Sequence, residues 1–186
     1  MKKLLLATFA VLVGTLSQAQ SLNSRKDTEE SLSIRTNYLV EGQQLGVSLD
    51  YVLNKATNEE IWGLSIVLHS RNVRFNVDKG SKLLIRTFSD NIIELKQIKE
   101  FYQIYQRKEY PYESANDYNT TDWLLDPYYF IETVDLEKIM NEGVKKMRFE
   151  TSKGMKDLEW KKDVFGQMVL SEYNLILKKS NFEKDF

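Results

Sequence analysis

The residues best suited to recognising a ligand are aromatic, and they are concentrated between positions 101 and 130. This segment holds ten aromatic residues, close to half of the Trp, Tyr and Phe residues in the chain. Tyr and Trp combine a flat apolar face with a polar tip, which suits both sugar stacking and protein interfaces. The sequence therefore predicts a ligand-binding site formed by Tyr110, Tyr112, Tyr118, Trp123 and Tyr128. Alternatively, these rings are structural and cover one end of a sheet, because aromatic residues also favour strands.

His69 is the only histidine and therefore the default general base. It lies at the end of an expected strand, on the face that it shares with Ser65. Ser70 points to the opposite face, and the chain contains no Gly-x-Ser-x-Gly motif. A catalytic triad needs three convergent groups, and the sequence shows only one of them. The pattern favours a polar residue at a strand end, so we assign no catalytic residue.

A pair of carboxylates could instead hydrolyse a glycosidic bond, which requires two such groups roughly 5–10 Å apart across the bond. The possible members of such a pair are Glu94, Asp122, Asp126 and Glu132. The chain has 27 acidic residues, and nothing in their spacing selects one pair. A carboxylate-dependent hydrolase acting on a glycan is therefore the alternative function.

The segment Asp117–Asp122, with Asp126 beyond it, is rich in the oxygen ligands that calcium prefers. It does not match the EF-hand loop. Asp122 occupies the sixth position, where glycine is required, and Tyr128 the twelfth, where a bidentate Glu belongs. Local turn chemistry of Asp and Asn explains the same residues without a metal. We expect no metal site and no cofactor.

The composition excludes several classes of function. The 186 residues include 26 Lys and Arg against 27 Asp and Glu, so the chain lacks the basic surplus typical of nucleic-acid binding. The absence of cysteine excludes disulfides, thiolate zinc sites and a Cys nucleophile. The length and the hydrophobic fraction of 42% are typical of one globular domain.

The N-terminal residues 1–19 have the pattern of a signal peptide. Two lysines precede the apolar run Leu4–Leu16, and Ser17 and Ala19 occupy the positions that a signal peptidase recognises. The apolar run is shorter than the ~20 residues that a bilayer-spanning helix needs. We therefore expect an exported protein, periplasmic or extracellular, without stable membrane insertion after cleavage.

Beyond this segment, we expect residues 20–36 to form a flexible leader, because they are polar and lack apolar periodicity. Residues 37–186 then form a single α+β domain. Apolar residues alternate with polar ones from Leu45 to Leu53 and again from Trp62 to Leu68. Because a polar loop joins these two runs, they predict an antiparallel pair of strands.

The rest of the domain is expected to continue the sheet as a meander and to add two helices. Three strands are predicted at residues 73–77, 83–88 and 92–96, with turns at 78–80 and 89–91. Thr133 is expected to cap a short helix that runs through Asn141, with Gly143 as its C-terminal stop. Two strands follow, at 144–151 and 155–160, and an amphipathic helix at 161–180 packs on the sheet. The whole sheet would have roughly seven to nine strands.

Two segments resemble known sequences. Ser17-Gln18-Ala19-Gln20 is similar to signal-peptide ends in Bacteroidota-type bacteria, where Gln often follows the cleaved Ala. Residues 79–86, followed by Ile93-Glu94-Leu95, resemble a strand-turn-strand segment of uncharacterised small exported proteins of that group. The resemblance implies export and a β-rich fold, and it brings no active site.

Together these features favour a non-catalytic exported binding or accessory protein over an enzyme. Its partner would be a glycan or an envelope protein, held by the aromatic segment. Two structural signatures separate this function from the hydrolase alternative. Binding predicts exposed, coplanar rings between Tyr110 and Tyr129, whereas hydrolysis predicts two carboxylates that face each other in a cleft.

Overall fold

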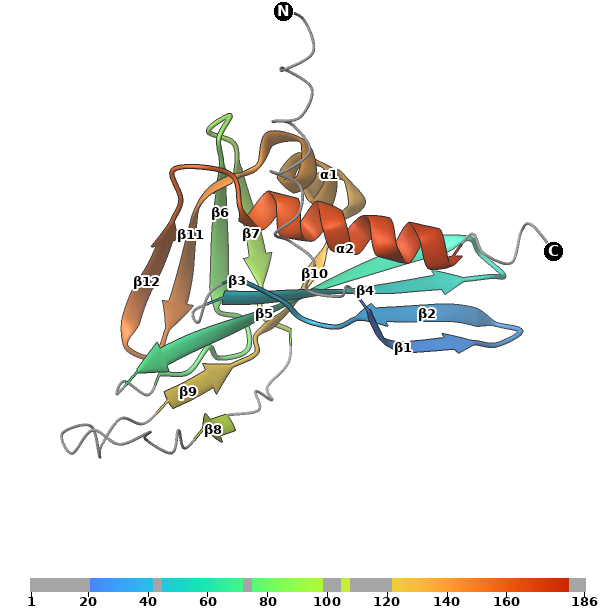
Figure 1. The fold of residues 1–186 in the computed structure, drawn as a ribbon, viewed down its shortest axis with the longest axis horizontal. Helices are drawn as coiled ribbons and strands as arrows, with labels where there is room; N and C mark the ends of the chain where they lie inside the picture. The colour runs from blue at the N-terminus through green and yellow to red at the C-terminus, as the bar shows by residue number, and fades with distance from the viewer. Residues whose placement is uncertain (1–20, 42–44, 72–74, 99–104, 108–121, 181–186) are drawn as a thin grey trace, which may run out of the picture.

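The computed structural model describes residues 21–41, 45–71, 75–98, 105–107 and 122–180, which form two antiparallel sheets and two helices (Figure 1). The large sheet contains β1 (Leu22–Asp27), β2 (Ser31–Thr36), β3 (Leu39–Glu41), β4 (Leu45–Asn54), β5 (Glu59–Arg71), β8 (Tyr105–Arg107), β9 (Asp122–Leu125) and β10 (Tyr128–Ile131). Its strand order is β1-β2-β4-β5-β9-β8, with β3 also paired to β4 and β10 also paired to β5. The predicted α+β class, mainly antiparallel with a C-terminal helix packed on the sheet, is confirmed.

The centre of the large sheet is the long hairpin of β4 and β5. Its register runs without interruption from Leu45 opposite Leu68 to Asn54 opposite Glu59, as the two alternating runs predicted. One face of this hairpin is apolar and buried: Leu45, Val47, Leu49, Tyr51, Trp62, Leu64, Ile66 and Leu68. We call this the inner face, and the opposite one the outer face.

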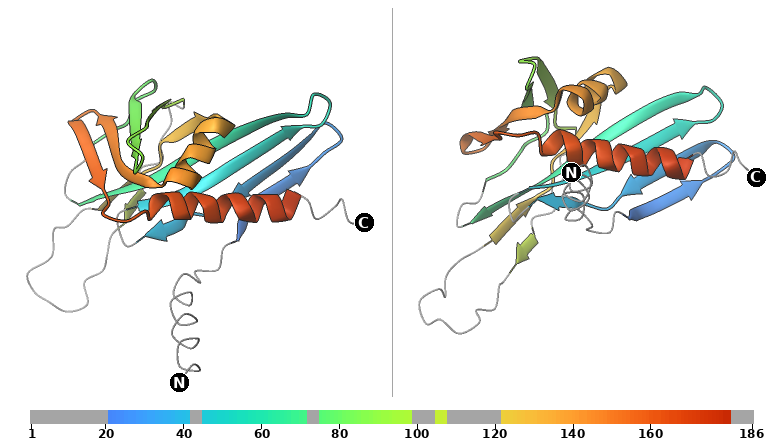
Figure 2. Two further views of the ribbon diagram at one scale, coloured as in Figure 1. Left: turned by 90° about the horizontal axis from the view of Figure 1, so that it is seen from above. Right: turned by 45° about the horizontal axis from the view of Figure 1, so that its top comes forward.

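Helix α2 (Phe165–Ser180) covers the inner face. It buries Phe165, Met168, Val169 and Ile176, and it packs on β2 and β4. The shorter helix α1 (Thr133–Glu142) packs beside α2, so both described helices lie on the same side of the large sheet (Figure 2). Among the described residues, no helix is long and apolar enough to cross a bilayer.

The small sheet contains β6 (Lys82–Thr87), β7 (Ile92–Lys96), β11 (Val144–Thr151) and β12 (Gly154–Glu159), in the order β12-β11-β6-β7. Its predicted turns are confirmed, since Gly80, Asp90 and Gly154 all have positive φ angles. Gly143 ends α1 with a φ of 67°, also as predicted. The small sheet meets the large one at a bridge between Gln97 and Tyr129.

Several predictions were wrong. The leader expected at residues 20–36 instead forms β1 and β2, an antiparallel hairpin at the edge of the large sheet. Its apolar side chains are few, but Leu32 and Ile34 are buried on the inner face. The strands also divide into two sheets, because β6 pairs with β11 and not with β5. The strand expected at 73–77 is not formed in its described part, although Phe75 and Val77 are buried.

The starts of both helices differ from the prediction: α1 begins one residue earlier and α2 begins later. Thr133 is the first residue of α1, whose N-cap position is held by Glu132 without a side-chain hydrogen bond. Helix α2 begins at Phe165 and not near residue 161, because Asp163 accepts a hydrogen bond from the backbone N–H of Gly166 and so fixes the first turn.

Candidate functional site on the outer face

The outer face of the large sheet carries a polar centre that no described helix covers (Figures 1 and 2). Side chains alternate along a strand, so the residues between the buried ones point away from α2. On β4 these include Ser48 and Asp50, and on β5 they include Gly63 and Ser65. Arg35 of β2 lies opposite Asp50, and Tyr128 of β10 lies opposite Ser65.

Arg35 of β2 and Asp50 of β4 form a bidentate ion pair. The guanidinium Nε donates to Asp50 Oδ1 at 2.5 Å, and a second guanidinium nitrogen donates to Oδ2. The hydrogen bond to Asp50 raises the pKa of Arg35 further above its already high value. The Tyr128 hydroxyl contacts the same pair, and burial and the charge of Asp50 raise its pKa above the ordinary tyrosine value.

A second group forms around Asp126, which lies between β9 and β10. The Tyr38 hydroxyl donates to Asp126 Oδ2 at 2.5 Å, and the Ser65 hydroxyl donates to Oδ1. Tyr38 Oη and Ser65 Oγ are also 3.2 Å apart. Burial and the hydrogen bond to Asp126 raise the pKa of Tyr38 above its ordinary value. A hydrogen bond from Ser48 also reaches this tyrosine.

We call these residues the outer-face cluster: Arg35, Tyr38, Ser48, Asp50, Ser65, Asp126 and Tyr128. Both carboxylates of the cluster already accept hydrogen bonds from a guanidinium or from hydroxyl groups. The two tyrosines hold their protons, since their pKa values are raised. The arrangement offers fixed donors and rings to a ligand, and it lacks a side chain set up to take a proton from a substrate.

Exposed apolar side chains surround the cluster on the same face. Val40 lies opposite Gly46, Ile61 opposite Val52, and Phe130 opposite Gly63. The exposed fractions are 38% for Tyr38, 45% for Val40, 43% for Ile61 and 56% for Phe130. Phe130 also meets the Tyr128 ring edge-on, with centroids 6.2 Å apart. We call Val40, Ile61 and Phe130 the apolar rim, and Tyr38 remains part of the outer-face cluster.

Of the five residues predicted to bind a ligand, the structure places Tyr128 in this cluster. Its side chain is 9% exposed, so it is largely covered and not a free stacking platform. Trp123 lies in β9, but its side chain is outside the described part of the structure. Tyr110, Tyr112 and Tyr118 also lie outside the described residues.

The carboxylates considered for hydrolysis are spread over separate elements. Glu94 pairs with Lys82 on the small sheet, with an Nζ–Oε1 distance of 3.0 Å. Glu132 precedes α1, and Asp126 belongs to the outer-face cluster. The side chain of Asp122 lies outside the described residues.

The other chemical candidates are only partly described. His69 lies in β5, with its side chain outside the described part, and residues 117–121 of the possible calcium loop lie outside it as well. Within the described ranges, no group of three or more His, Asp or Glu side chains could hold a metal ion.

The sequence did not point to most of the outer-face cluster. Arg35 and Tyr38 lie in or beside the segment expected to be a leader, which drew attention away from them. Asp50 offered the clearest signal, because a charged residue in the middle of a central strand requires a partner.

No family model, no curated protein and no solved structure matches this chain.

Proposed function

We propose that this protein is a non-catalytic binding protein of an exported compartment, and that it holds a partner protein on the outer face of its large sheet. The supporting observation is the combination of the apolar rim with a polar cluster whose charges are already paired. Interfaces are enriched in Tyr, Phe and Arg, and prepaired charges lower the cost of removing water from a surface. Support for export comes from the pattern of residues 1–19.

A protein partner fits this face better than a glycan. Val40 and Ile61 contribute exposed aliphatic side chains, which pack well against another protein but offer no flat ring for a sugar. Phe130 is the aromatic side chain of the rim, and it meets Tyr128 edge-on. The hydrolase alternative has less support, because Asp50 and Asp126 are each held by hydrogen bonds.

Site-specific photocrosslinking in the native cell tests the proposal. A crosslinking amino acid at Phe130 or Val40 is expected to give discrete adducts with one partner protein. The same probe at Met155, which is 64% exposed on β12 of the small sheet, serves as the matched control. Adding Ile61→Ser to the Phe130 probe should remove the adduct without unfolding the protein, because Ile61 is exposed.

Two results would contradict this proposal. Equal adducts from Phe130 and Met155 would show that the outer face has no special role. A glycan array gives the other result, namely specific hits that disappear in Phe130→Ala. Those hits would replace the protein partner with a glycan. Trp123→Ala and Tyr112→Ala extend the array to the aromatic segment that the sequence indicated.

A further inference from the structure

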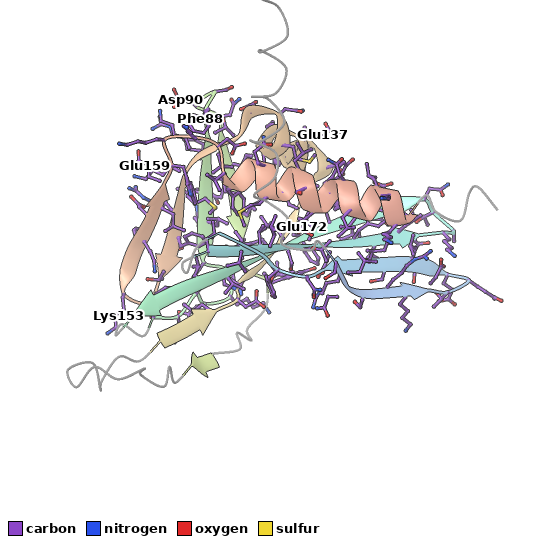
Figure 3. The ribbon with its side chains drawn as sticks, in the orientation of Figure 1. Phe88, Asp90, Glu137, Lys153, Glu159 and Glu172 are labelled. Atoms are coloured by element: carbon purple, nitrogen blue, oxygen red, sulfur yellow. The ribbon has the colours of Figure 1, made fainter. Side chains whose placement is uncertain are left out.

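A carboxyl group is buried where α2 meets the large sheet. Glu172 lies on the buried side of the helix, among Met168, Val169 and Ile176, and only 1% of it is exposed. Figure 3 shows it between α2 and the large sheet. The side chain is therefore surrounded by apolar groups, an environment that strongly disfavours a carboxylate.

No positive charge compensates Glu172 within the described part of the chain. Burial raises its pKa above the ordinary value, and the Thr36 hydroxyl of β2 partly offsets that rise. Its Oε2 atom is buried without a hydrogen-bond partner. The Thr36 hydroxyl is itself engaged, since it accepts a hydrogen bond from the N–H of Leu49 at 3.0 Å.

The titratable groups on the surrounding elements are engaged or exposed. On β4, the Tyr51 hydroxyl donates to Glu60, and on α2, Tyr173 stacks against Trp62 of β5. The inner face of β5 contributes Glu60, which is exposed and accepts the Tyr51 hydrogen bond, and the inner face of β2 contributes no titratable side chain among those described. On α1, Asp135 pairs with Lys138.

The remaining acidic groups near the helices are also accounted for. Glu142 of α1 accepts hydrogen bonds from Thr87 and Asn91, and Glu137 is exposed. Before α2, the Asp163 carboxylate binds backbone N–H groups. The protonation state of Glu172 is therefore governed by burial and not by a neighbouring charge.

We propose that Glu172 is a proton-controlled latch, which keeps α2 seated on the large sheet when it is protonated and loosens the helix when it loses its proton. The topology allows this movement, because α2 follows all the described strands and no strand pairing depends on it. Release of α2 would uncover the inner face around Trp62 and Leu49.

The direction of the pH effect follows from the raised pKa. The carboxyl group titrates at its ordinary value when α2 is released and at a higher value when α2 is seated. The closed state therefore has its full stability below the ordinary pKa of glutamate and loses it as pH rises through the raised pKa. Between these two values, the opening constant should rise about tenfold per pH unit.

Hydrogen exchange of residues 165–180, corrected for the intrinsic pH dependence, measures this opening constant. The wild-type protein is expected to lose protection of α2 on going from about pH 4 to about pH 8. Glu172→Gln should remove the dependence, because a neutral amide replaces the acid. Glu137→Gln, the same change at an exposed position of α1, should behave as the wild type.

Other outcomes would overturn the latch. The proposal fails if the opening constant of α2 in the wild type does not change with pH. It also fails if the opening constant of Glu172→Gln rises with pH as steeply as that of the wild type, because this carboxyl would then not control α2. Glu172→Met provides a second neutral side chain of similar length in case the amide packs poorly. If neither variant folds, the carboxyl is required for the fold itself, and the proposal is wrong.

Discussion

Gly63→Ala is expected to lower the free energy of unfolding by about 2–4 kcal/mol, because the added methyl group overlaps a buried ring and breaks its hydrogen bond. A Cβ at this position would lie 1.9 Å from Tyr128 Oη and 2.5 Å from the adjoining ring carbon. The Tyr128 ring packs over Gly63, and its hydroxyl interacts with Asp50, which lies opposite Gly63 on β4. The alanine would displace the ring and expose the Arg35–Asp50 pair.

Chemical denaturation provides the measurement, and Gly46→Ala provides the matched control. Gly46 is buried on the same face, but a Cβ there would approach no atom closer than 3.4 Å. Its cost should therefore stay below about 1 kcal/mol. In a Tyr128→Ala background the effect of Gly63→Ala should also become small. If Gly63→Ala and Gly46→Ala lowered the free energy of unfolding by similar amounts, the overlap between the new methyl group and Tyr128 would be disproved.

Asp163→Ala is expected to lower the free energy of unfolding by about 2–4 kcal/mol. The substitution removes a helix cap and leaves a second backbone N–H group without its partner. Asp163 Oδ1 accepts hydrogen bonds from the N–H groups of Gly166 at 2.8 Å and Val144 at 2.9 Å. One carboxylate thus fixes the first turn of α2 and the start of β11. Loss of this contact should loosen the junction between α1, β11 and α2.

Thermal and chemical unfolding of Asp163→Asn separates the hydrogen bonds from the charge. Asparagine keeps an acceptor oxygen, so its cost should be less than half that of alanine. Equal losses for Asn and Ala would show instead that the negative charge stabilises the helix terminus. The same contact explains why residue 166 is a glycine. A Cβ there would lie 2.7 Å from the Asp163 carboxylate and from the carbonyl of Ile139.

Parts of the fold with strong local signals could be predicted from the sequence. The β4–β5 hairpin, the β6–β7 hairpin and the buried side of α2 all follow from regular spacing of large apolar residues. Glycine and Asp90 marked the turns, because their backbone conformations are restricted to a few residue types. In these elements the local pattern and the tertiary burial agree.

Edge strands and the site itself depend on contacts that a single sequence does not contain. Strand β1 is almost wholly exposed and is held by backbone pairing with β2, so it has no apolar signature. The outer-face cluster is assembled from four strands and the segments between them, and its members lie far apart in the chain. The pairing of Arg35 with Asp50 depends on register, which spacing within either strand does not reveal.

The link between the two sheets has a mechanical consequence. Gln97 continues from β7, and its side-chain oxygen accepts a hydrogen bond from the N–H of Tyr128 at 2.6 Å, while the N–H of Ile98 donates to the carbonyl of Tyr128 at 3.2 Å. Strand β10 is thus bonded to β5 on one side and to the small sheet on the other. Force applied to the outer face at Tyr128 is shared by both sheets. We therefore expect the two sheets to resist such a force together and not to separate at β10.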